Sequence, residues 1–193
     1  MNELLSYLSQ FGAPSEETLS ILYDSIRPDT LKKGKYFIRE GEYANEIAFL
    51  ESGVVRAFYV NSQGKEYNKT LFTDHAIIGS YAALISKEKN RLPQQALTDC
   101  TIWRIQFALI EQLSENDCEV ERIRRKIAER FFVWNEKKQL EMALLEAKER
   151  YSIFLREHPG VEDLIPQYHI ASYLGVSPTQ LSRIRQNINP NDE

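Results

Sequence analysis

The residues best suited to chemistry lie near the C-terminal end of the sequence, where hydroxyl, amide and guanidinium side chains follow one another without an acidic residue. Groups of these types can read the edges of DNA bases, Arg on guanine and Gln on adenine, and they can also hold phosphates. The set that helical spacing places on one outward face comprises Ser177, Thr179, Gln180, Ser182, Arg183, Arg185 and Gln186. We expect these side chains to bind double-stranded DNA, the alternative being an ordinary solvated polar face.

The segment that carries these residues has the pattern of a helix-turn-helix. Gly175 lies where a tight turn between helices needs a positive φ, and Ala171 leaves room for the second helix to approach. Ser177, followed by Pro178 and then by Gln180, forms a capping box that begins the second helix. In such a motif the second helix enters the major groove.

The middle of the chain has the sequence pattern of short β-strands. Runs rich in β-branched and aromatic residues alternate with turns that contain glycine, which is typical of an antiparallel sandwich, roll or barrel. The turn at residues 61–64, with sequence NSQG, predicts a hairpin in which Gly64 supplies the positive φ. The five predicted strands are residues 35–39, 46–51, 54–60, 67–72 and 100–105.

Helices are predicted on both sides of this β-rich region. Two short helices open the chain, the second capped by Ser15. Residues 114–158 contain neither Gly nor Pro, and Asn116 with Glu119 has the spacing of a capping box at their start. We therefore expect a long helix there.

One apolar stripe on this long helix has the spacing of a face that pairs with another helix. Its members are Val120, Ile123, Ile127, Phe131 and Trp134. We expect the stripe to pair with its copy in a homodimer, the alternative being packing within the chain. The next positions of the stripe, Lys138 and Glu141, are polar, which predicts a hinge at residues 135–139 before a new domain.

The order of these parts resembles the catabolite activator (Crp/Fnr) superfamily of dimeric bacterial transcription regulators. The resemblance implies an α+β fold with an N-terminal double-stranded, jelly-roll-like β-roll flanked by helices, a long dimerisation helix and a C-terminal helix-turn-helix. The implied domains are a sensor at residues 1–115, a dimer helix at 116–138 and a DNA-binding domain at 139–193. The positions that match the family's β-roll signature are Gly34, Ile38, Gly41, Glu42, Ala44, Ile47, Phe49, Leu50 and Gly53.

The segment that would bind a cyclic phosphate departs from the family pattern. Ser80 stands where the family has the acid that binds the ribose hydroxyl, and Arg91 falls about one position away from the family arginine. We therefore expect no binding of cyclic AMP, and either a different small anionic effector or constitutive activity. The residues that would line such a pocket are Gly79, Ser80, Tyr81, Arg91, Gln94 and Gln95.

Several classes of protein are disfavoured by composition. The three histidines are scattered and the two cysteines, expected to be buried thiols, have no CxxC spacing, so we expect no metal, no cofactor and no enzymatic activity. The N-terminal residues do not resemble a secretory signal, and we expect a cytoplasmic protein without a membrane partner.

Two features favour a rival function. The net charge is −4, from 24 basic and 28 acidic residues, which gives little non-specific attraction to DNA. The segment after Gln186 is also too short for the β-hairpin wing of the family. The alternative is thus a β-roll sensor or interaction protein that has lost productive DNA binding, although such a protein would not be expected to keep a capped, acid-free second helix.

Overall fold

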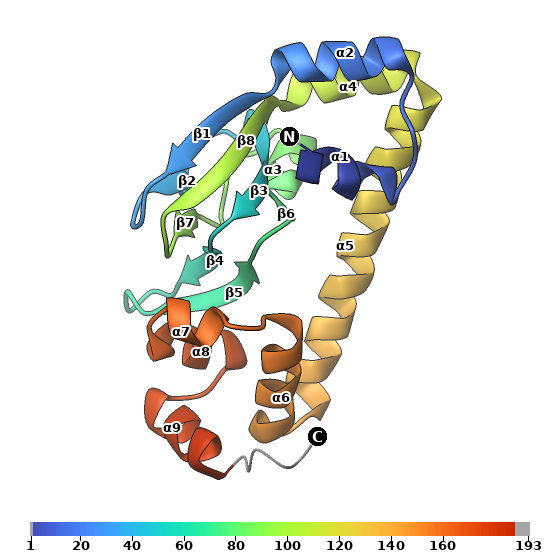
Figure 1. Cartoon of the computed structure of the whole chain (residues 1–193). Coiled ribbons are helices and arrows are strands. Elements are labelled where there is room, and N and C mark those ends of the chain that lie inside the picture. Colours follow the sequence, from blue (N-terminus) through green and yellow to red (C-terminus); the bar gives the residue numbers. More distant parts are fainter. Residues whose placement is uncertain (1, 188–193) are drawn as a thin grey trace.

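The computed structural model describes residues 2–187, in which two antiparallel sheets of four strands form a β-roll (Figure 1). Their inward side chains, among them Leu50, Val55, Phe72, Ile78 and Ile102, form the buried core of the roll. The first sheet has the order β1 (Arg27–Leu31), β8 (Cys100–Gln106), β3 (Glu46–Ser52) and β6 (Ala76–Ile78). The second has the order β2 (Tyr36–Ile38), β7 (Gln94–Ala96), β4 (Val55–Val60) and β5 (Glu66–Phe72).

All five predicted strands are present, as β2, β3, β4, β5 and β8. The predicted hairpin joins β4 to β5: the Asn61 carboxamide oxygen accepts from the amides of Gln63 and Lys65, and Gly64 has a φ of 78°. The sequence did not predict β1, β6, β7 or helix α3 (Tyr81–Ser86).

The helices at the N-terminus pack beside those that follow the roll. Helices α1 (Asn2–Ser9) and α2 (Glu16–Ser25) are present as predicted, and the Ser15 hydroxyl accepts from the amide of Thr18. After the roll come α4 (Phe107–Asn116) and α5 (Cys118–Leu144). The predicted capping box of Asn116 and Glu119 is wrong, because α4 occupies Asn116 and the carboxylate of Asp117 caps α5 instead.

Helix α5 is continuous through residues 135–139, so the predicted hinge is not there. The polar residues that suggested it pair with each other: Lys138 Nζ lies 2.8 Å from Glu141 Oε2 on the inner side of α5 and also binds Glu157. The helical run is interrupted at residues 145–146, before α6 (Ala147–Glu157).

The C-terminal helices are α7 (Val161–Leu164), α8 (Gln167–Leu174) and α9 (Pro178–Asn187). Gly175 ends α8 with a φ of 69°, so the turn requires glycine. A Cβ there would lie 2.6 Å from Cε at the flexible end of the Met142 side chain, which would have to move aside. The predicted capping box of α9 is present, with Ser177 and Gln180 each bonding the other's backbone amide. The wing predicted to be missing concerns residues 188–193, which lie outside the described residues.

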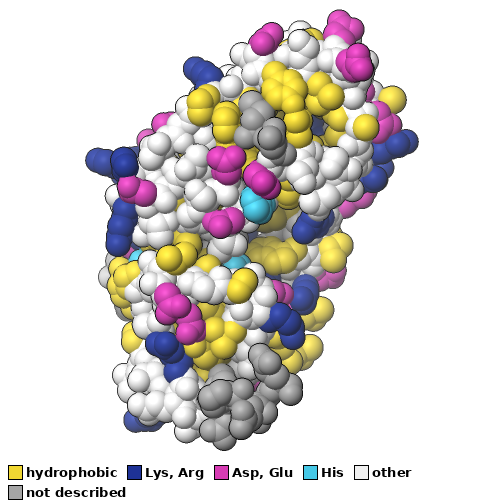
Figure 2. All heavy atoms as spheres, in the orientation of Figure 1, with side chains coloured by type: hydrophobic (Ala, Val, Ile, Leu, Met, Phe, Trp, Pro, Cys, Tyr) yellow, Lys and Arg dark blue, Asp and Glu magenta, His cyan; other side chains and the backbone are white. Residues whose placement is uncertain are grey.

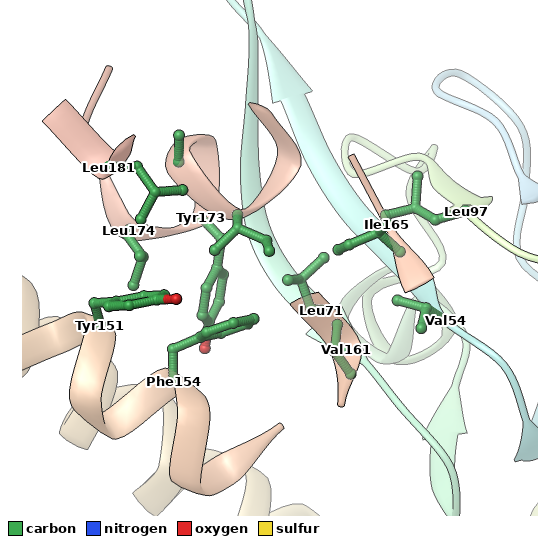
Figure 3. Close-up of a cluster of buried hydrophobic side chains, with 12 residues drawn as sticks. Val54, Leu71, Leu97, Tyr151, Phe154, Val161, Ile165, Tyr173, Leu174 and Leu181 are labelled. Atoms are coloured by element: carbon green, nitrogen blue, oxygen red, sulfur yellow. The ribbon is translucent and has the colours of Figure 1, made fainter. Parts of the chain in front are cut away.

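The helix-turn-helix and the roll share one hydrophobic cluster (Figure 3). Phe154, Ile170 and Leu181 of the helices are continuous with Val54 and Leu71 of the second sheet. Helix α8 lies against β5, so the roll and the helix-turn-helix are packed together. Among the described helices, none combines the length and the apolarity needed to cross a membrane.

Candidate nucleic-acid interface and effector pocket

Helix α9 presents all seven predicted DNA-binding residues to solvent. Leu181 and Ile184 anchor the helix to the hydrophobic cluster, which turns the intervening positions outward. The exposed set is Ser177, Thr179, Gln180, Ser182, Arg183, Arg185 and Gln186. The structure therefore brings the predicted residues together on one accessible helix.

These side chains are not equally free. Arg185 lies 3.5 Å from a carboxylate oxygen of Glu162, whose other oxygen accepts from the Tyr151 hydroxyl at 2.8 Å. Burial, together with Glu162, raises the pKa of Tyr151 to about 12, so its phenol remains a donor at neutral pH. Arg183 is exposed and has no ion pair to another described residue.

A hollow of about 370 Å³ adjoins this face of α9. Gln167, the first residue of α8, lines it, and the Oε1 atom of Gln167 is buried without a hydrogen-bond partner among the described residues. Gln167 was not among the predicted DNA-binding residues, because those were confined to the second helix of the motif and its cap. Its place at the start of the first helix was the available signal. The hollow's other lining residues are Pro178, Leu181, Ser182, Arg185 and Gln186.

The predicted effector residues are not assembled into one site. Gly79, Ser80 and Tyr81 lie at the start of α3, where the Gln94 side chain accepts from the Gly79 amide at 2.9 Å and donates to its carbonyl at 3.1 Å. Gln95 points to the other face of β7, where its side-chain oxygen accepts from Arg56.

Arg91 lines a different, open hollow of about 530 Å³. Its lining residues also include Glu40, Tyr43, Lys87 and Lys89. The neighbouring Asn90, which the sequence analysis missed, is fully buried and binds the carbonyls of Arg39 and Leu92. The side-chain amides of Gln94 and Asn90 thus form hydrogen bonds with backbone groups that a ligand would otherwise be able to bind.

The predicted dimer stripe is only partly free. Val120 and Ile123 are buried within the chain, where a Cβ on Gly12 would come 3.0 Å from the Ile123 side chain. Farther along α5, Phe131 is exposed and stacks on Trp134 at 5.7 Å, while Ile127 is half-buried. The N-terminal part of the stripe is therefore buried within the chain, where Ile123 lies beside Gly12 in the connection between α1 and α2.

A second apolar set lies on the other side of α5. It consists of Phe132, Val133, Leu140 and Leu144, with exposed fractions of 70%, 62%, 54% and 75%. Figure 2 shows hydrophobic side chains interspersed with basic ones along the edge where α5 runs.

Two further expectations concern cysteine and metal. Cys100 is buried as expected, but the expectation is wrong for Cys118, which is the first residue of α5 and is exposed. Within the described part of the chain, no group of three or more His, Cys, Asp and Glu side chains could hold a metal ion.

Residues 28–117 match the family of cyclic nucleotide-binding domains. FixK2 from Bradyrhizobium japonicum superposes with a TM-score of 0.74 at 20% identity, over 83% of each chain. A crp/fnr-family protein from Eubacterium rectale gives 0.71 at 16% identity, over 89% of this chain and 82% of its own. The chain has the Crp/Fnr fold.

Another protein of similar structure is CLP from Xanthomonas campestris, a c-di-GMP-responsive global regulator, with a TM-score of 0.66 at 16% identity over 89% of this chain and 90% of CLP. No curated protein matches the chain. The Crp/Fnr fold confirms the predicted fold class, in which a β-roll, a long helix and a C-terminal helix-turn-helix follow in that order.

Proposed function

We propose that this chain is a dimeric transcription regulator that binds two-fold symmetric DNA through α9. The observation that carries the proposal is the exposed surface of α9, where hydroxyl, amide and guanidinium groups are held on a capped and anchored helix without an acidic residue. A decayed helix would not be expected to keep both the cap and the reading side chains. Catalysis is no part of the proposal.

We further propose that cyclic AMP is not the effector. Ser80 has no carboxylate for a ribose hydroxyl, and the backbone groups of Gly79 are already bonded by Gln94. A ligand phosphate would have to displace an amide whose two bonds are internal and uncharged. The site therefore favours constitutive DNA binding or a small anionic effector of another kind.

The dimer would form through the long helix. Paired copies of α5 would cover the second apolar set, which consists of the exposed Phe132, Val133, Leu140 and Leu144. Uncovered, these side chains would present an apolar surface that is unusual for a monomer.

The test is selection of bound sequences from random double-stranded DNA by the purified full-length protein. We expect an enriched palindrome with half-sites about one helical turn, roughly 34 Å, apart, as two recognition helices on a dimer require. Failure to enrich any sequence, together with no mobility shift at micromolar protein, would favour the rival β-roll interaction protein.

The contribution of one side chain sharpens this test. Arg183→Ala should lose base preference at one position of each half-site, at a cost of roughly 1 to 3 kcal/mol there. Equal loss on every sequence would instead identify Arg183 as a phosphate contact. Arg156→Ala is the matched control, because it removes the same charge from an exposed position on α6.

A further inference from the structure

Helix α8 packs on the outer face of the second sheet. Val54, Leu71 and Leu97 extend from the roll and, in Figure 3, approach Val161 and Ile165 of the C-terminal helices. Apolar contact of this kind holds two parts together but is non-directional, so it does not by itself fix their angle.

A buried arginine adds direction to this contact. Arg56 of β4 is only 5% exposed, and its guanidinium lies 2.6 Å from Glu66 and donates two bonds to Gln95. Its Nη1 atom also lies 3.5 Å from Nδ1 of His169, on α8. Burying a guanidinium costs free energy unless hydrogen-bond and ion-pair partners surround it. The buried Arg56 therefore favours the one arrangement in which all of its partners are in place.

The next strand binds α8 at two successive turns. Asn68 of β5 donates from its side chain to the His169 carbonyl at 2.9 Å, and its backbone amide donates to the Ser172 hydroxyl at the same distance. The Ser172 hydroxyl in turn lies 3.5 Å from the Glu66 carbonyl. Two attachment points three residues apart fix both the rotation and the sliding of α8 on the sheet.

This attachment leaves the proposed reading face uncovered. Helix α9 follows α8 through the tight turn at Gly175 and packs on it through Leu181, while its polar side chains are exposed. The contact with the roll therefore does not hide α9. It sets the direction in which α9 points relative to the roll and to α5.

We infer that Arg56, Asn68, His169 and Ser172 form a clamp that holds the helix-turn-helix at one orientation, so that a dimer reads half-sites at one fixed spacing. In this arrangement Arg56 and Asn68 are positioning residues that act on DNA recognition through α8. The inference rests on the proposed function, because spacing has meaning only for a DNA-binding dimer.

The test compares Arg56→Met with Arg104→Met in the full-length protein. Arg104 is the matched control: it lies in the other sheet and also makes two ion pairs, to Asp29 and Glu46. Each protein is titrated with palindromes whose half-site separation is the selected one or differs by one or two base pairs, and with a single half-site.

The wild type and the Arg104 variant should discriminate against the altered separations by about tenfold or more, which corresponds to about one directional bond to a charged group. The Arg56 variant should lose most of this discrimination while keeping the half-site affinity. A loss of folding would instead weaken all DNA equally.

Amide hydrogen exchange of α8 provides a readout that needs no DNA. Faster exchange at residues 169–174 in Arg56→Met, and to a smaller degree in Ser172→Ala, is expected. The milder Ser172 variant, measured on the same DNA series, also decides the matter if Arg56→Met does not fold. If the variants change neither the amide exchange of α8 nor the discrimination between half-site spacings, the clamp is overturned. If the wild type binds no DNA, the proposed function is overturned, and the amide exchange alone decides whether the clamp holds α8.

Discussion

At the scale of single residues, Asp117, the C-cap of α4, joins that helix to α2 and to the start of α5. Its carboxylate accepts from the Thr18 hydroxyl at 2.7 Å, from the Ser15 amide and from the Glu119 amide, so it ties α2 to the start of α5. These bonds lower the pKa of Asp117 from its ordinary 3.8 to about 2.

We expect Asp117→Ala to lower the free energy of unfolding by about 1 to 2 kcal/mol, the usual effect of removing a helix cap. The folded-state pKa is below the unfolded one, so the ionised carboxylate stabilises the protein fully above about pH 4, and this contribution is lost as the pH falls toward 2. Denaturant unfolding across this range should show the pH dependence in wild type and less of it in the variant. Glu115→Ala, an exposed acid on α4, is the control.

The hydrogen bonds of Gln94 lead us to expect that cyclic nucleotides do not bind. Because its side chain bonds both backbone groups of Gly79, calorimetry should give no heat with cyclic AMP or cyclic GMP at physiological concentrations. Micromolar affinity for either nucleotide would contradict this expectation and would require Arg91 to move to the phosphate. In that case Arg91→Ala should abolish the heat of binding without dissociating the dimer.

At the scale of elements, α5 has apolar side chains on two sides, and they have different partners. The N-terminal part of one side packs within the chain, while Val133 and Leu140 on the other are exposed seven residues apart, two helical turns along one face. We expect Val133→Asp with Leu140→Asp to yield monomers in sedimentation. Gln139→Asp is the control for added negative charge, since it places one acid on an exposed polar position of the same helix. A wild type that sediments as a monomer at micromolar concentration would exclude the paired helix.

The elements that were predicted from the sequence are those with strong local signals. Strands β3 and β4 are short runs of apolar and aromatic residues bounded by turns, and helix α9 begins at a capping box, so their local signals agree with the fold. Strand β7 was missed because it is not an apolar run: Gln94 is buried and Gln95 half-buried, and both are held by hydrogen bonds. Strand β1 was missed because it is a largely exposed strand at the edge of its sheet and contains Pro28.

The outcomes on α5 have a related cause. Helical periodicity predicts that a face is buried, but it does not say against which partner, and Val120 and Ile123 of the predicted dimer stripe are buried within the chain. The polar positions at Lys138 and Glu141 suggested a hinge, although they lie on the inner side as an ion pair and continue the helix. The candidate DNA-binding residues lie together in the structure because they are local in sequence, whereas the candidate effector residues come from separate segments.

At the scale of the whole molecule, the contact between the roll and the helix-turn-helix contains a histidine, His169, that lies beside the guanidinium of Arg56. His169 is buried in the contact, and its Nδ1 atom faces both Arg56 and the Asn68 amide, so it must act as an acceptor. Burial and the charge of Arg56 lower the pKa of His169 to about 4, although Glu66 opposes the shift.

Acid should therefore loosen this contact. The folded-state pKa of about 4 is below the ordinary 6.5, so the neutral imidazole stabilises the docked arrangement fully above about pH 6.5, and this contribution, up to about 3 kcal/mol, is lost as the pH falls toward 4. Amide exchange of α8 should accelerate over that range in the wild type. His169→Gln, whose side-chain oxygen can still accept from Asn68, should reduce the acceleration. His158 is also buried and has a lowered pKa, so its protonation in acid would destabilise the adjacent α6 in the same way. His158→Gln must therefore be measured in parallel. If His169→Gln leaves the exchange profile of α8 unchanged, the acid sensitivity of the contact does not arise at His169.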